Sequence, residues 1–187
     1  MEDDIQMILE MTEEAMQAAI DHLQKELVKI RTGKASTAML HGILVPYYGS
    51  PTPLSQVSNI STSDARTLNI QPWEKNMLGP IEKAIFEANL GLTPQNNGEV
   101  IILNIPPLTE ERRKDFVKKT KALGEESKVG IRNARKEGMD SIKKAIKEGY
   151  PEDAGKRKED QIQELTNSYT KKIDGLVEVK EKDIMTI

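Results

Sequence analysis

The chain has 187 residues, of which 30% are charged, and its net charge is −3. It contains no cysteine, which excludes disulfide bonds and thiolate chemistry. The N-terminal sequence MEDDIQM is acidic and unlike a secretory signal, and no stretch approaches the roughly 18 apolar residues of a membrane span. We therefore expect a cytoplasmic protein with no membrane partner.

Residues 3–30 have the pattern of one long helix. Leu9, Met16, Leu23 and Ile30 recur every seven residues, as on the buried side of a helix in a bundle. The sequence RTG at 31–33 ends this segment, because glycine is the common residue just after a helix.

Residues 34–105 differ in character, since β-branched residues, proline and glycine become common. They predict a small α+β unit. Its expected elements are a short strand and turn at 42–51, strands at 53–61 and 66–72, a helix at 74–91 ending at Gly91, and a turn followed by an apolar strand at 96–107.

Residues 109–147 predict a second long helix. Thr109 is a suitable N-cap, and Glu110 and Glu111 lie where the helix dipole favours acidic residues. Three glycines inside this helix each cost about 1 kcal/mol relative to alanine. We expect them to allow close approach of neighbouring helices; they are Gly124, Gly130 and Gly138.

This second helix also carries the only basic segment of the chain. Residues 106–147 contain 13 basic and 7 acidic residues, whereas residues 1–31 contain 3 and 8. On a helical wheel the basic side chains gather roughly opposite the apolar ones: Lys114, Lys118, Lys121, Lys128, Arg132, Arg135, Lys136 and Lys143. Such a stripe can neutralise successive phosphates of a nucleic acid. The alternative is a solvated face whose charges pair with the acidic first and third helices.

After Pro151, residues 152–185 predict the third helix. The expected fold class is α+β, with residues 1–31 and 106–187 forming an elongated three-helix bundle. A small domain at 32–105 is inserted between the first two helices, and two connectors near 31–33 and 104–107 join it to the bundle.

No segment has the residues of a catalytic or metal site. His22 and His41 lie far apart in the sequence and lack the neighbours of a metal motif or a catalytic triad. A glycine-rich phosphate loop is also missing. Trp73, the only tryptophan, is expected to be packed rather than to serve as a base-stacking platform. We therefore expect no enzyme, no cofactor and no metal.

Five segments together resemble the bacterial ribosome recycling factor family: KIRTGKAS, PYYGSPTPLSQVSNIS, ARTLNIQPWEKNMLGPIEKAI, LGLTPQNNGEVIILNIPPLTEERRKDFVKKTK and KVGIRNARKEGMDSIKK. They occur in order through nearly the whole chain. The resemblance implies a three-helix bundle joined by a two-stranded hinge to a small β/α/β sandwich domain. It also implies a factor that binds the post-termination ribosome and, with elongation factor G and GTP, splits it into subunits and frees mRNA and tRNA.

The partners that this resemblance implies are large-subunit ribosomal RNA and elongation factor G, with no DNA, and we expect a monomer. The arginines of RTG and of RN.R belong to the RNA-binding face in the family, and they correspond to Arg31, Arg132 and Arg135. Lys128 is their neighbour, and the wheel adds Lys121 and Lys136. The expected hinge residues are Arg31, Thr32 and Gly33 on one connector and Asn104, Ile105 and Pro106 on the other.

Three positions depart from the family pattern, namely Lys34, Asn97 and Ile102, where arginine, aspartate and arginine are common. Two other classes of function remain open at this point. A helical adaptor or coiled-coil chaperone would require exposed apolar helix tips, whereas these tips are polar. A hydrolase housed in the small domain would require a constellation of residues that the sequence lacks.

Overall fold

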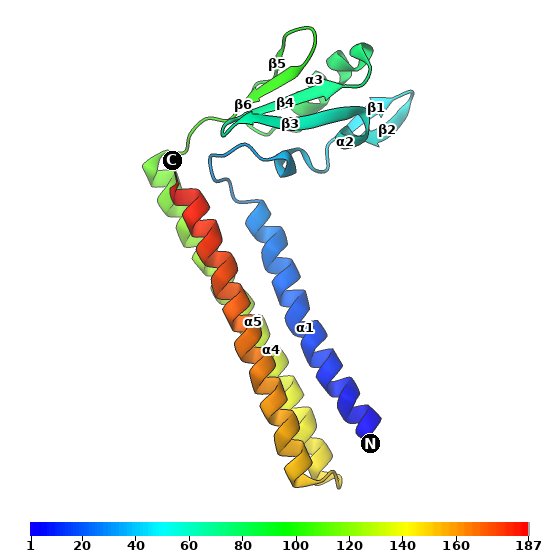
Figure 1. The fold of residues 1–187 in the computed structure, drawn as a ribbon, viewed down its shortest axis with the longest axis vertical. Helices are drawn as coiled ribbons and strands as arrows, with labels where there is room; N and C mark the ends of the chain where they lie inside the picture. Colours follow the sequence, from blue (N-terminus) through cyan, green and yellow to red (C-terminus); the bar gives the residue numbers. More distant parts are fainter. Residues whose placement is uncertain (187) are drawn as a thin grey trace. The chain divides into compact units, whose positions relative to one another are not determined.

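The computed structural model describes residues 1–186, and the chain divides into two compact units (Figure 1). The helical unit comprises Met1–Ile30 and Glu111–Thr186, and the small unit comprises Arg31–Glu110. Over the described residues, none of the helices combines the length and the apolar composition that a membrane crossing would require.

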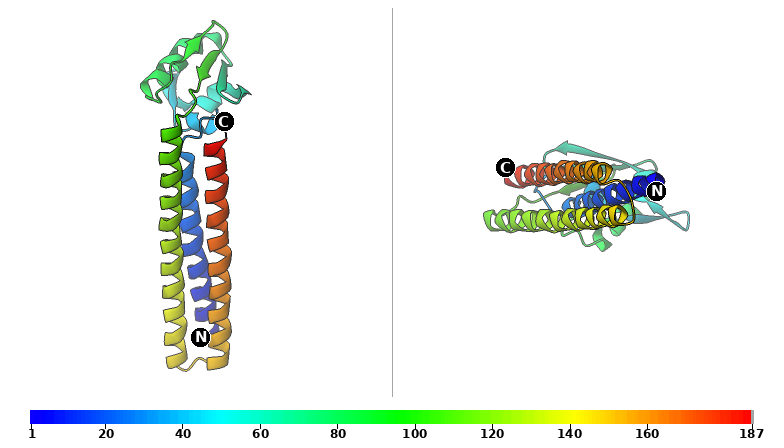
Figure 2. Two further views of the ribbon diagram at one scale, coloured as in Figure 1. Left: turned by 90° about the vertical axis from the view of Figure 1, so that its left-hand side faces the viewer. Right: turned by 90° about the horizontal axis from the view of Figure 1, so that it is seen from below.

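The helical unit consists of α1 (Glu2–Val28), α4 (Glu110–Lys147) and α5 (Glu152–Met185). The three helices lie side by side along their length (Figure 2). They confirm the helices predicted at 3–30, 109–147 and 152–185. Each helix turns an apolar stripe inward, and the buried side chains include Met16, Ile20, Leu23, Ile131, Ile162 and Ile173.

The glycines of α4 lie where neighbouring helices approach closely. A Cβ atom on Gly124 would lie 2.7 Å from Cγ2 of Val177, and one on Gly130 would lie 3.4 Å from the Cβ of Ala19. These contacts confirm that glycine permits close helix packing here. The propensity cost of glycine is therefore offset by packing that a larger residue would disturb.

The small unit is built on an antiparallel sheet in the order β3-β4-β6-β5. Its strands are β3 (Ser58–Asp64), β4 (Thr67–Pro72), β5 (Gln95–Asn96) and β6 (Ile101–Asn104), and a separate hairpin pairs β1 (Leu44–Tyr47) with β2 (Ser50–Pro53). The helices are α2 (Leu54–Val57) and α3 (Leu78–Glu87), with 3-10 turns at Thr37–Leu40 and Lys75–Met77. The fully buried Leu68, Ile70, Ile81, Ile101 and Leu103 belong to its own core.

Two expectations for the small unit were wrong. The segment 53–61 is not one strand, because Leu54 and Val57 are buried together on one side of a single helical turn. The hydroxyl of Ser58 donates a hydrogen bond to the carbonyl of Leu54 at 2.7 Å, which closes that turn. Helix α3 ends at Glu87 rather than at Gly91, because Asn89 adopts a left-handed φ of 53°.

The connector residues are held within the small unit. Gly33 has a φ of 78°, a conformation that glycine adopts freely. The backbone N–H of Ile105 donates to the carbonyl of Arg66 at 2.7 Å, and the Ile105 side chain is buried. Asn104 pairs with Thr67 in the β4–β6 ladder. A pivot at Asn104 and Ile105 would have to break these contacts, so their role as a hinge stays a prediction.

Candidate nucleic-acid interface

The basic side chains of α4 gather on one side of the helix, with Glu125 as the main interruption. We call the set predicted from the wheel, Lys114 to Lys143, the basic face of α4. The buried side of α4 is formed by other residues, among them Thr120, Ser127, Ile131, Ala134 and Ile142. Most members of the basic face are exposed, whereas Lys128 and Arg135 are partly buried and contact α5.

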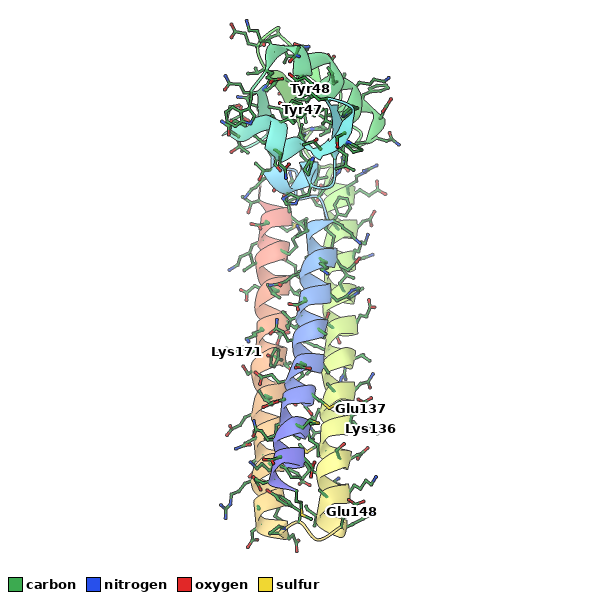
Figure 3. All side chains as sticks on the ribbon, turned by 90° about the vertical axis from the view of Figure 1, so that its right-hand side faces the viewer. Tyr47, Tyr48, Lys136, Glu137, Glu148 and Lys171 are labelled. Atoms are coloured by element: carbon green, nitrogen blue, oxygen red, sulfur yellow. The ribbon has the colours of Figure 1, made fainter. Side chains whose placement is uncertain are left out.

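Lys121, Arg132 and Lys136 are exposed members of the basic face. Within residues 1–186, no carboxylate forms an ion pair with any of the three. The Nε of Arg132 donates to the carbonyl of Lys128 at 3.4 Å, one turn earlier in the helix. Figure 3 shows Lys136 on α4 beside Glu137. These three cations are available to a polyanion without first breaking a salt bridge.

Lys128 is engaged with α5. Its Nζ lies 2.6 Å from Oδ1 of Asp174 and 3.7 Å from Oε1 of Glu125. The side chain of Lys128 is 27% exposed. The hydrogen bond to Asp174 is the main cause that raises the pKa of Lys128 above its ordinary value. At this position the alternative interpretation, pairing with the acidic third helix, therefore describes the structure.

Arg135 is half-buried and also contacts α5. Its Nε donates to Oε1 of Gln163 at 2.8 Å, and Nε2 of Gln163 donates in turn to Oδ1 of Asn167 at 2.9 Å. This chain of hydrogen bonds fixes the direction of the guanidinium group. Asp174 and Gln163 were not predicted as partners of Lys128 and Arg135. A wheel of α5 would have placed both on one side of that helix.

Arg31 belongs to the small unit, not to the helical unit that carries the other five predicted RNA-binding residues. Its guanidinium donates to the carbonyl of Leu90, which follows α3. The Nη atoms of Arg31 also lie 3.8 Å from the position of a Cβ on Gly91. The side chain is therefore held by backbone of its own unit.

The small unit carries two neighbouring tyrosines, Tyr47 and Tyr48 (Figure 3). The hydroxyls of Tyr47 and Tyr48 each lie 3.3 Å from a different carboxylate oxygen of Glu74. The two rings meet edge to face at 4.6 Å, and Tyr48 has a φ of 48°. Trp73 is 68% exposed, so the expectation that it is packed was wrong.

The two histidines give no indication of a metal site, since His22 and His41 are both exposed. In the described part of the chain, no three or more histidine or acidic side chains are grouped as a metal ion would require.

Comparison with known proteins identifies close relatives of this chain. The family model described as ribosome recycling factor matches residues 23–185. The ribosome-recycling factor of Flavobacterium johnsoniae is 57% identical over 187 residues, which is the full length of both chains. That of Bacteroides fragilis is 48% identical and covers 98% of this chain and 99% of its own.

Solved structures agree with these sequence matches. A solution structure of a ribosome recycling factor aligns with a TM-score of 0.82 at 39% identity and covers 98% of both chains. A second structure contains the T. thermophilus ribosome recycling factor and E. coli elongation factor G bound to the E. coli post-termination complex. Its matching chain has a TM-score of 0.67 and 43% identity over 97% of this chain and 99% of that one.

Proposed function

The chain belongs to the ribosome recycling factor family, and from this premise we propose how it works. It binds the post-termination ribosome and acts there with elongation factor G as a translation factor. In our proposal this joint action, driven by GTP, splits the ribosome into subunits and releases mRNA and tRNA. The observation that carries the function is the 57% identity to a ribosome-recycling factor over the full length of both chains.

We propose that the basic face of α4 is the surface that contacts large-subunit ribosomal RNA. Lys121, Arg132 and Lys136 support this proposal, because all three are exposed and lie on the same side of α4. Neutralising several phosphates releases counterions and gives binding that depends steeply on salt. The carboxylates of the described helices leave these three cations unpaired, which favours an external anion as their partner.

Lys128 and Arg135 make a different contribution in this proposal. Arg135 is directed by Gln163, so its remaining N–H groups can meet a phosphate with little loss of side-chain freedom. Lys128 must break its ion pair with Asp174 before it can contact a phosphate. Its net contribution to the free energy of RNA binding is therefore smaller than that of an unpaired lysine. Arginine at 132 and 135 also offers bidentate hydrogen bonding to phosphate, which lysine does not.

We further propose that the chain catalyses no reaction itself and that GTP is hydrolysed by elongation factor G. Because the chain acts on ribosomes, we assign it to the cytoplasm, where it acts as a monomer. We also propose that the two connectors, Arg31–Gly33 and Asn104–Pro106, allow the small unit to be repositioned during recycling.

The test is the breakdown of polysomes by the purified chain with elongation factor G and GTP. We expect polysomes to be converted to subunits only when all three components are present. Controls omit the chain, the elongation factor or GTP in turn. Polysomes that stay intact in the complete mixture, while a ribosome recycling factor of known activity disassembles them, would refute the proposed function.

A further inference from the structure

The outer side of α1 exposes apolar side chains that the core of the helical unit does not use. Met7 and Met11 are 58% and 62% exposed, and Ala15 and Ala18 are exposed as well. The four positions lie on one side of the helix, because they are separated by three or four residues. We call them the methionine stripe of α1. The buried side of the same helix is formed by other residues, among them Ile5, Met16 and Leu23.

No element of the described chain covers this side of α1. In Figure 3, α1 lies in front of α4 and α5, and the view faces the side of α1 that is turned away from both. Isolated apolar residues on a protein surface are common, but a row of them along a helix is a feature of docking surfaces. Methionine is favoured at such surfaces because its flexible, polarisable side chain adapts to its partner.

Acidic residues flank the stripe. Glu10, Glu14 and Asp21 each follow a stripe residue by three positions, and Asp3 precedes Met7 by four. Across the described residues, no lysine or arginine forms an ion pair with these four carboxylates. Residues Glu2–Val28 contain eight acidic residues and a single basic one, Lys25. The stripe therefore lies in a strongly negative field.

This charge distribution selects among the possible occupants of the stripe. RNA and anionic lipid would be repelled by the flanking carboxylates. A second copy that presented its own α1 would bring like charges together. A basic amphipathic segment instead matches both features, with apolar side chains on the methionines and lysine or arginine on the carboxylates.

We propose that the methionine stripe of α1 binds a basic amphipathic helix of a protein partner. The inference is independent of the RNA interface on α4, because it rests on a different helix and on charge of the opposite sign.

The probe is a synthetic, fluorescently labelled 18-residue peptide of leucine and lysine with all leucines on one helical face. Binding to the intact chain is followed by fluorescence anisotropy. We expect M7Q/M11Q to weaken binding at least about tenfold, since it removes the apolar contact. The matched control is M185Q, which changes an exposed methionine on α5 and should leave binding unchanged. The control peptide has the same composition but carries leucines on all sides of the helix. Wild type and M7Q/M11Q should bind this control peptide equally weakly.

Salt and charge provide a second, independent measurement. Binding should weaken as salt rises, and E10Q/E14Q should make that dependence shallower. All variants should melt at the wild-type temperature, because the substituted side chains are exposed. Equal binding by wild type and M7Q/M11Q, or no preference for the one-sided peptide, would overturn the proposal. So would a dimer in sedimentation that M7Q/M11Q dissociates, since a second copy would then be the occupant.

Discussion

Gly138 of α4 packs directly on Thr12 of α1, so closely that a Cβ on Gly138 would lie 2.6 Å from the Thr12 hydroxyl oxygen. Thr12 is buried and has little freedom to move, because its hydroxyl donates a hydrogen bond to the carbonyl of Ile8 at 2.7 Å. Ile162 of α5 lies on the same site, with its Cδ1 at 3.2 Å from the same position. The absence of a Cβ atom at Gly138 thus allows α1, α4 and α5 to meet closely at this level of the bundle.

This relationship predicts that Gly138→Ala lowers the free energy of unfolding. The gain in helix propensity of about 1 kcal/mol is opposed by an overpacking cost of about 1–3 kcal/mol. We therefore expect a net loss of about 1 kcal/mol, measured by urea denaturation. The control is Gly175→Ala on α5, where nothing beyond the adjacent residues and the local helix backbone lies within 4 Å of the new methyl group. That variant should gain stability, and equal gains in both would contradict the packing argument.

Arg132→Ala tests the RNA interface. We expect ribosome binding to weaken by about 1–3 kcal/mol, because a charge-assisted contact to phosphate is lost. Folding should change little, since the side chain is exposed. The measurement is co-sedimentation with ribosomes across a salt series, where the slope should also become shallower by about one. Lys119→Ala removes an exposed cation from α4 outside the basic face and should retain wild-type binding. Equal losses in both variants would argue against a defined interface.

Asp174→Asn is expected to strengthen ribosome binding. The carboxylate holds Lys128 at 2.6 Å, so its removal frees that cation for a phosphate. Stability should fall by no more than about 1 kcal/mol, because the Asp174 side chain is 60% exposed and such pairs contribute little. In the same salt series, we expect higher affinity at low salt and a steeper slope. Asp160→Asn, which alters an exposed aspartate of α5 that forms no ion pair with the described residues, is the control. Unchanged affinity in Asp174→Asn would mean that Lys128 does not contact RNA.

Gly33→Pro tests the connector. Proline fixes φ near −65°, whereas Gly33 has a φ of 78°, so the chain must take a different path there. We expect splitting of ribosomes with elongation factor G, followed by light scattering, to fall more than ribosome binding does. Gly42→Pro imposes the same backbone conflict at a φ of 82°, away from the connectors, and controls for damage to the small unit. Parallel loss of binding and splitting in Gly33→Pro would exclude a hinge role.

The long helices were predictable because their apolar periodicity extends over many turns, as the recurrence of Leu9, Met16, Leu23 and Ile30 illustrates. The turn at Leu54–Val57 was not, since four residues are too few to show a period and Pro53 is equally compatible with a strand edge. The basic face of α4 could be predicted, because it depends on the sequence of one helix alone. The partners of Lys128 and Arg135 could not follow, because Asp174 and Gln163 reach them only through tertiary packing of α5.

The position of Trp73 has a spectroscopic consequence. It is the only tryptophan and lies exposed in the small unit, while the helical unit contains only Tyr150 and Tyr169 among tyrosines and tryptophans. In the purified chain, indole emission therefore reports on the small unit alone. The chain has no cysteine, so one thiol introduced on an exposed turn of α5 can carry an acceptor dye at a unique site. In the purified chain, energy transfer from Trp73 to that dye would follow the separation of the two units in solution.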